Sequence, residues 1–174
     1  YSLSLAQAIA RNAGEHEIWL ALNARLPESI ADIRAAFAGL VPERRIRLFD
    51  VPTSRQSTPW VIQSAHVIRE RFLETLQPDV VLITSLVEGY LSPAVTSIGA
   101  TDTRYKTAVV LYDLIPLLNQ ATYLPRPELR TYYAEKIEWL KNADALLAIS
   151  DSSRQEAIEH LAIDGNKIAN ISAA

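Results

Sequence analysis

The stretch DVVLITS, residues 79–85, is the clearest indication of the fold. Its apolar residues follow one another without the polar alternation that marks a strand with one face in water, and three of them are β-branched. A run of this kind is typical of a strand that is covered on both faces, as in a parallel sheet. The sequence therefore predicts a buried strand of an α/β protein here.

Similar apolar runs recur along the chain, and a helical pattern separates each from the next. We expect strands in EIWLALN, RIRLFDV, KTAVVLYD, ALLAIS and KIANISA, at residues 17–23, 45–51, 106–113, 145–150 and 167–173. Helical spacing of three and four is clearest over residues 58–76, where Pro59 lies near the first turn and Pro78 follows the end. The other helices are expected at residues 3–14, 27–40 and 129–140, and from 152 onward.

Apolar strands that alternate with helices predict parallel βαβ units with right-handed crossovers. We therefore expect a single α/β domain over residues 1–174, with a Rossmann-like, doubly wound, mostly parallel sheet and helices on both faces. A chain of this length can form a core without disulfides or metals. Two irregular segments are expected: residues 88–102, with one short helix, and a proline-rich loop at 113–127, whose length is commonly functional.

The composition excludes several classes of protein. No cysteine is present, which excludes thiolate metal sites, cysteine nucleophiles and a disulfide-based secreted scaffold and favours a cytoplasmic location. A net charge of -3 argues against a general nucleic-acid binder, and no apolar run approaches the roughly 20 residues of a membrane span. The arginines at 44, 45, 47, 69 and 71 are interpreted as surface charge, with contact to anionic lipid headgroups as the alternative.

Polar side chains end five of the six predicted strands. In a parallel sheet these ends share one edge, where ligands of open α/β proteins bind. The same residue types also cap helices and start turns, so each position alone has that second interpretation. The candidate site is therefore predicted from the shared edge. Its residues are Asn23, Asp50, Thr84 with Ser85, Tyr112 with Asp113, and Ser150 with Asp151.

Asp113 interrupts the apolar run VVLYDLIPLL, residues 109–118. An unpaired carboxylate is costly to bury, so we expect the strand to reach the sheet edge at this point. Pro116 then prevents the chain from continuing as a strand.

A well-marked helix start follows the strand that ends at Ser150. The pairs Ser153–Glu156 and Ser152–Gln155 have the spacing of a capping box. The exposed amides of this helix start could bind a phosphate or a sugar carboxylate, or the serine side chain could satisfy them.

Glu88 and Gly89, in SLVEGYLSP, lie just past a predicted strand end. The carboxylate could accept hydrogen bonds from substrate hydroxyls and the glycine could allow close backbone approach, although a solvated loop acid explains the same residues. The histidines at 16, 66 and 160 lie on predicted helices or helix ends away from the strand ends, so neither a Ser/His/Asp arrangement nor a metal site is expected. The five glycines form no phosphate-binding motif.

Three segments together resemble a known family. TSLVEGY (84–90), VVLYDLIPLL (109–118) and YYAEKIEWLKNADALLAISDSSRQE (132–156), with the spacing between them, are similar to the amino-terminal domain of retaining GT-B glycosyltransferases. Within that family the likeness is to the group 1 mannosyl-type transferases of bacterial polysaccharide synthesis. It covers nearly the whole chain, and DLIPL and LKNADALLAIS are its most specific parts.

The resemblance implies that residues 1–174 are the acceptor-side half of a two-domain hexosyltransferase. The enzyme would move a hexose such as mannose from a nucleotide sugar to a glycan or lipid-linked acceptor. The donor would be held mainly by a carboxyl-terminal domain absent here, without a metal or other cofactor, and this half alone would be inactive. Family members begin with a strand and a glycine-rich loop, whereas YSLSLAQAIA resembles the helix that follows them. We therefore expect a cytoplasmic protein that continues beyond this chain, with peripheral membrane contact as an option.

One position departs from the family pattern. Many relatives carry histidine before the aspartate of the DLIP segment, where this chain has Tyr112. A phenol, whose ordinary pKa is about 10, shuttles protons at neutral pH less readily than an imidazole. The resemblance therefore implies sugar positioning by Tyr112 and Asp113. Substrate contacts are expected from Ser85, Glu88, Gly89, Ser150 and Asp151.

Two other functions remain open at this point. One is half of a sugar-nucleotide epimerase, which would need several acids and a histidine around its cleft. The other is a non-catalytic, flavodoxin-like binding or scaffolding domain, which would make no saccharide contact at the strand ends.

Overall fold

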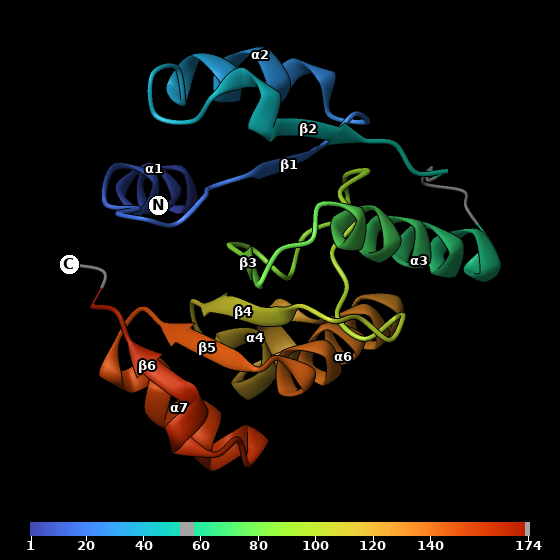
Figure 1. Cartoon of the computed structure of the whole chain (residues 1–174). Helices are drawn as coiled ribbons and strands as arrows, with labels where there is room; N and C mark the ends of the chain where they lie inside the picture. The colour runs from blue at the N-terminus through green and yellow to red at the C-terminus, as the bar shows by residue number, and fades with distance from the viewer. Residues whose placement is uncertain (53–57, 173–174) are drawn as a thin grey trace.

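The computed structural model describes residues 1–52 and 58–172, and in this part strands and helices alternate along the chain (Figure 1). All strand pairs are parallel, which confirms the predicted Rossmann-like α/β class. Each of the six predicted strands is present, although shorter than its apolar run. The strands are β1 (Leu20–Asn23), β2 (Ile46–Phe49), β3 (Val80–Ile83), β4 (Lys106–Leu111), β5 (Ala145–Ala148) and β6 (Ile168–Asn170).

The described strands form two hydrogen-bonded parallel sheets. β1 pairs with β2, and the other four strands follow in the order β3-β4-β5-β6. Within the described residues β1 and β3 each pair on one side only, so each has an open edge. Among the described residues no strand joins those two edges.

Five long helices lie where the spacing predicts them. Proline occupies the first turn of three of them, where its fixed φ suits the helix and its missing N–H is not needed. In Figure 1, α1 and α2 lie with β1 and β2 in one part of the molecule, while α6 and α7 lie with β4, β5 and β6 in the other. The five are α1 (Ser2–Arg11), α2 (Pro27–Ala36), α3 (Pro59–Thr75), α6 (Pro127–Asn142) and α7 (Asp151–Leu161).

Both segments expected to be irregular differ from the prediction. The loop at 113–127 contains two short helices, α4 (Ile115–Leu118) and α5 (Gln120–Tyr123). Residues 84–105, by contrast, form no helix or strand, so the short helix expected within 88–102 is absent. Side chains from neighbouring helices hold that segment in place, as described below.

The main core lies between the four-stranded sheet and α6 and α7. Val109, Val110 and Leu111 of β4 are each at most 3% exposed, so this strand is covered on both faces, as its uninterrupted apolar sequence predicts. Tyr133 of α6 and Leu161 of α7 belong to the same core cluster. Each large apolar side chain buried in this way stabilises the fold by about 1.5–3 kcal/mol.

Two smaller core clusters lie in the amino-terminal part of the chain. One surrounds Phe37, between α1, α2 and the two-stranded sheet, and the other joins Val51 to Ala65 of α3. Arg69 on α3 is 8% exposed and donates to the carbonyl of Ser97, so its assignment to surface charge is wrong. A single helix, α3, thus carries apolar contacts to one sheet and a buried cation to the 84–105 segment.

Candidate functional site

A cavity of about 170 Å³ lies at the carboxyl ends of β3 and β4. The parallel register, in which Ile83 lies opposite Val109, brings these two strand ends side by side. Three of the predicted site residues, Ser85, Tyr112 and Asp113, line the cavity together with Tyr133 and Lys136 of α6.

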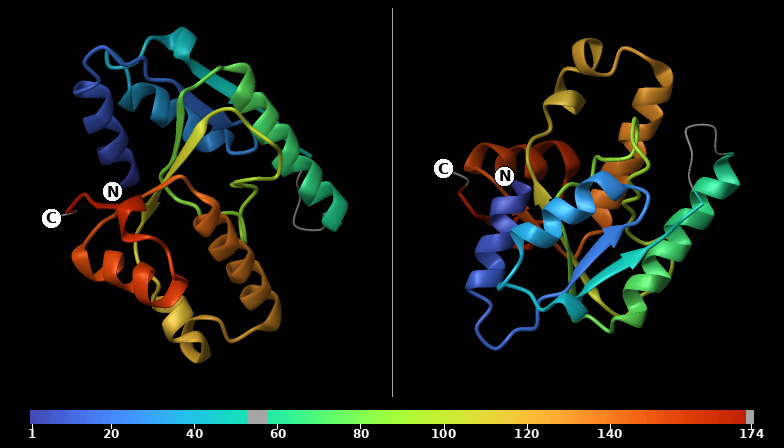
Figure 2. Two further views of the ribbon diagram at one scale, coloured as in Figure 1. Left: turned by 60° about the horizontal axis from the view of Figure 1, so that its bottom comes forward. Right: turned by 90° about the horizontal axis from the view of Figure 1, so that it is seen from above.

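The Tyr112 side chain contacts the start of α1. Its hydroxyl lies 2.6 Å from Oγ of Ser2, and Ser2 Oγ donates to the carbonyl of Thr84 at 3.3 Å. The ring of Tyr1 meets the ring of Tyr112 edge-on, with 5.7 Å between the centroids. Helix α1 therefore begins at the carboxyl ends of β3 and β4, and its first turn lies beside the cavity; its position is visible in both views of Figure 2.

Asp113 is exposed at the mouth of the cavity. Its Oδ1 accepts the amide of Ile115 at 3.0 Å, so one oxygen starts the turn into α4. This is the turn-forming role that polar residues at strand ends often have. The carboxylate of Glu156 accepts the amide of Leu114 at 3.2 Å and joins α7 to the same turn. Within the described residues Oδ2 of Asp113 takes no hydrogen bond, so it can accept one from a ligand.

Ser85, Glu88 and Gly89 form a compact turn beside the cavity. Ser85 Oγ donates to Oε1 of Glu88 at 3.1 Å, and the hydroxyl of Tyr132 donates to the Glu88 carbonyl. Gly89 has a φ of +110°, and a Cβ added there would lie 2.4 Å from the carbonyl oxygen of Ala94. Close backbone approach at Gly89 is thus present in the structure, although the approaching group belongs to the same chain.

Ser150 and Asp151 lie at the same sheet edge but do not line the cavity. Ser150 Oγ accepts the amide of Ser153 at 3.1 Å and caps α7, which begins at Asp151. The predicted capping boxes that start at Ser152 and Ser153 are therefore wrong: the helix begins earlier than its serine pattern indicates. Asp151 accepts from Asn170 at 2.7 Å. Substrate contact by Ser150 and Asp151 stays a prediction.

The two remaining strand ends belong to the smaller sheet. Asn23 Nδ2 donates to the carbonyl of Pro93 at 2.9 Å and so ties the end of β1 to the 84–105 segment. Asp50 forms an exposed ion pair with Arg25 at 2.6 Å. Neither residue lines the cavity.

Lys136 is the main residue of this region that the sequence analysis misses. It is 3% exposed, and burial is the main reason why its pKa falls to about 7. Lys136 lies three residues after Tyr133 and one before Ile137, within the apolar stripe of α6. A lysine in such a stripe is unusual, and its position could have identified it as a buried residue.

Tyr133, on the wall of the cavity, remains a neutral phenol at physiological pH. Burial is the main cause that raises its pKa to about 12, and the carboxylates of Asp113 and Glu156 add to it. Tyr133 therefore adds no negative charge to the cavity that it lines.

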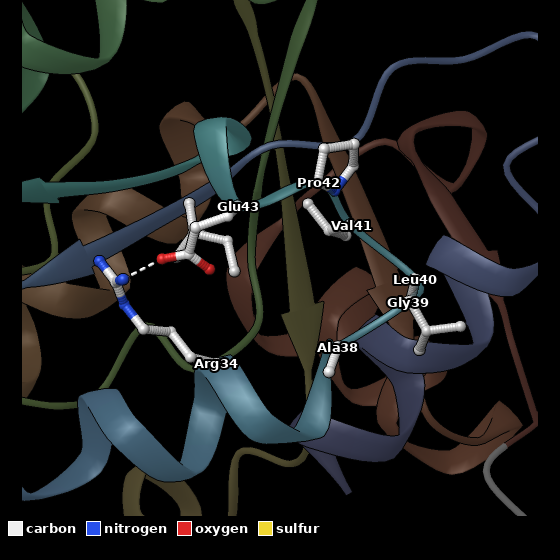
Figure 3. Close-up of a pocket in the computed structure, with 8 residues that line it drawn as sticks. Arg34, Ala38, Gly39, Leu40, Val41, Pro42 and Glu43 are labelled. Atoms are coloured by element: carbon white, nitrogen blue, oxygen red, sulfur yellow. Dashed lines mark hydrogen bonds and ion pairs between the residues drawn. The ribbon is translucent and has the colours of Figure 1, made fainter.

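A larger cavity of about 520 Å³ lies elsewhere, between the end of α2 and the start of β2 (Figure 3). Arg34 and Glu43 form an ion pair across it, and Val41 and Ile46 contribute apolar walls. Ile46 is the first residue of β2, so this cavity lies at the amino end of that strand. It contains none of the predicted site residues, and we assign the candidate site to the smaller cavity.

Within residues 1–52 and 58–172 no three histidine or acidic side chains gather as they would around a metal ion. A helix of sufficient length and apolarity to cross a membrane is likewise not found in this part of the chain.

Comparison with known proteins identifies similar sequences. Three Escherichia coli proteins, each named serotype-specific mannosyltransferase WbdA, are 34% identical to this chain over 175 or 176 residues, which is 98% of its length. The chain spans only about a fifth of these relatives, 21% or 22% of their length. No protein-family model matches the chain, and no solved structure does. The resemblance to bacterial polysaccharide mannosyltransferases is thereby confirmed.

Proposed function

We propose that this chain, which is homologous to part of the E. coli mannosyltransferases, is the acceptor-side domain of a hexosyltransferase. The reaction would transfer a hexose, with mannose as the first choice, from a nucleotide sugar to a glycan or lipid-linked acceptor. The observation that carries the proposal is the 34% identity along nearly the whole chain. A cytoplasmic location, which the lack of cysteine favours, belongs to the same proposal.

The cavity at the ends of β3 and β4 is the proposed contact surface for sugar. Oδ2 of Asp113 can accept a hydrogen bond from a sugar hydroxyl. Tyr112 lines the same cavity, and its hydroxyl lies 2.6 Å from Oγ of Ser2. Ser85 and Glu88 add a hydroxyl and a carboxylate after the end of the neighbouring strand β3. Hydroxyl-rich ligands suit such a set of acceptor oxygens.

The test is sugar transfer by the intact protein that contains this chain, after the substitutions Asp113→Asn and Tyr112→Phe. Each is expected to lower kcat/KM by about tenfold or more, because a removed hydrogen bond to bound sugar weakens transition-state binding. Asp32→Asn, an exposed position on α2, is the matched control and should leave transfer unchanged. Unchanged turnover in both site variants would remove these residues from the site.

We further propose that one strand of the domain lies outside this chain and fits between β1 and β3. Three features support this placement. Both strands have an open edge, and α1 starts at the carboxyl ends of β3 and β4, where the helix of a βαβ unit follows its first strand. Moreover, apolar residues of these strands are incompletely covered: Val80 is 58% exposed, and Leu20 and Leu22 are only half-buried.

Hydrogen exchange can test this placement. This chain is compared with a longer one that has roughly 20 more natural residues before Tyr1, enough for one strand and its turn. Backbone amides on the open edges of β1 and β3 should exchange much more slowly in the longer chain, because a strand between them would accept their hydrogen bonds. Equal exchange in the two chains would contradict the placement. A second domain for the nucleotide sugar is proposed on the carboxyl-terminal side.

The epimerase and scaffold alternatives receive no support from the site. An epimerase of this kind would need a histidine at its cleft, and none lines the cavity. His66, on α3, is buried against Trp139 instead.

A further inference from the structure

The 84–105 segment, which carries Ser85, Glu88 and Gly89, depends on side chains from two helices for its conformation. From α3, Arg69 donates to the Ser97 carbonyl at 3.1 Å, and Glu70 accepts the amide of Thr101 at 2.7 Å. These contacts hold the half of the segment that lies farther from the cavity. The half nearer the cavity is held from α6.

Two side chains of α6, four residues apart, contact that nearer half. Tyr132 donates to the carbonyl of Glu88. Lys136 Nζ donates to both oxygens of Thr96, at 3.1 Å to the carbonyl and 2.7 Å to Oγ1. The same Nζ lies 5.0 Å from the ring centre of Tyr132 and 4.2 Å from that of Trp139, which are cation–π distances.

Thr96 connects Lys136 to the turn beside the cavity through hydrogen bonds. Its hydroxyl accepts from Lys136 and donates to the carbonyl of Leu86 at 2.6 Å. Leu86 lies between Ser85 and the turn at Glu88, and all three belong to the surface beside the cavity. A continuous path of hydrogen bonds therefore runs from the buried amino group of Lys136 to the backbone of the turn.

We propose that Lys136 is a positioning residue for the candidate site, which acts through Thr96 to fix the turn formed by Ser85, Leu86 and Glu88. The inference rests on the proposed function, in that this turn contacts the acceptor. It assigns no chemical step to the lysine, because its Nζ is already directed at Thr96 and at two rings.

The buried position of Lys136 makes this contact sensitive to pH. Burial lowers its pKa from 10.5 to about 7; Glu135 and Glu88 oppose this shift, whereas Arg69 reinforces it. His66 faces the same cluster, but its pKa of about 4 leaves it neutral at higher pH. When the segment opens, the lysine enters water and regains its ordinary pKa, so opening binds a proton between pH 7 and about 10.5.

Opening should therefore become less favourable as pH rises through this range. With the two pKa values of about 7 and 10.5, the protection of the amides of residues 86–99 should increase roughly fivefold from pH 7 to 8. A further increase of nearly tenfold is expected from pH 8 to 9. Protection is measured by hydrogen exchange and corrected for the intrinsic rate of exchange at each pH.

The experiment uses the intact protein and the variants Lys136→Met, Thr96→Val and Lys141→Met. Lys136→Met should abolish the increase of protection with pH and raise KM for the acceptor about tenfold, with a smaller change in kcat. Thr96→Val keeps the lysine, so the pH effect should persist while KM rises. Lys141, an exposed lysine of the same helix paired with Glu138, is the control and should change neither.

Two results would overturn the inference. One is protection that still increases with pH in Lys136→Met, and the other is an acceptor KM that both Lys136→Met and Thr96→Val leave unchanged. If the protein transfers no sugar at all, the proposed function fails, and the exchange measurement still decides whether Lys136 holds the segment. The two proposals can therefore fail separately.

Discussion

Replacement of Gly89 by alanine tests whether the turn beside the cavity requires its observed backbone. Gly89 has a φ of +110°, a conformation that L-residues adopt only at a cost of about 1–2 kcal/mol. The new Cβ would also lie 2.4 Å from the backbone oxygen of Ala94, much closer than a carbon and an oxygen can approach. Because the obstacle is backbone, it cannot rotate away as a side chain would.

The magnitude follows from two contributions. Backbone strain contributes about 1–2 kcal/mol, and displacement of the 89–94 backbone adds about 1–3 kcal/mol, as in overpacked interiors. The segment cannot simply detach, because Leu86, Val95 and Ile98 are each at most 8% exposed and belong to the core. We therefore expect Gly89→Ala to lower the free energy of unfolding by about 3 kcal/mol.

Gly39→Ala is the matched control. Gly39 also has a positive φ, +77°, but a Cβ added there meets nothing within 4 Å. Its substitution should lower the free energy of unfolding by about 1 kcal/mol, from backbone strain alone. Urea-induced unfolding of both variants, followed by tryptophan fluorescence, measures the difference. Equal losses at the two positions would refute the reasoning, since the contact with Ala94 would then contribute nothing.

Three further predictions concern buried and strand-start polar groups. His66 has a pKa of about 4 through burial, so stability should fall by roughly 3 kcal/mol as pH drops from 6.5 to 4, and His66→Phe should remove this loss in pH-dependent urea unfolding. Glu70→Gln should lower the free energy of unfolding by about 2 kcal/mol, as measured by thermal unfolding. The amide nitrogen of glutamine would replace one of the two oxygens that accept the amides of Ala100 and Thr101. Asp144 accepts the amide of Thr107, which lowers its pKa, so Asp144→Asn should lower the free energy of unfolding near pH 7. Urea unfolding should show that this loss becomes smaller as pH falls below about 4.

The strands and the candidate edge could be predicted because each follows from local sequence. An apolar run such as that of β4 has no polar face, so it must be covered on both sides, and parallel pairing then brings Ser85 and Tyr112 to one edge. The cavity at these ends agrees with that reasoning. The roles of the residues around it remain predictions.

Other features could not be predicted because they depend on contacts that are distant along the chain. Residues 84–105 contain Gly89 and a proline, which indicate irregular backbone, but the groups that hold it come from Glu70 on α3 and Lys136 on α6. The periodicity of the sequence likewise does not predict that the strands divide into two sheets. A strand's apolar pattern reports how it is covered and not which strand lies beside it.

The strand-end residues differ in how free they are to bind a ligand, and this narrows the site. Ser150 already caps α7, and loss of a serine cap costs about 1 kcal/mol; Asp151 is already hydrogen-bonded to Asn170. A ligand that binds at Ser150 and Asp151 would first have to replace these contacts. At the other end, Asp113 uses only Oδ1 within the described residues and lies at the mouth of a cavity. Recognition of a sugar is therefore expected to concentrate at the ends of β3 and β4, and Asp113→Asn should impair it more than Asp151→Asn does.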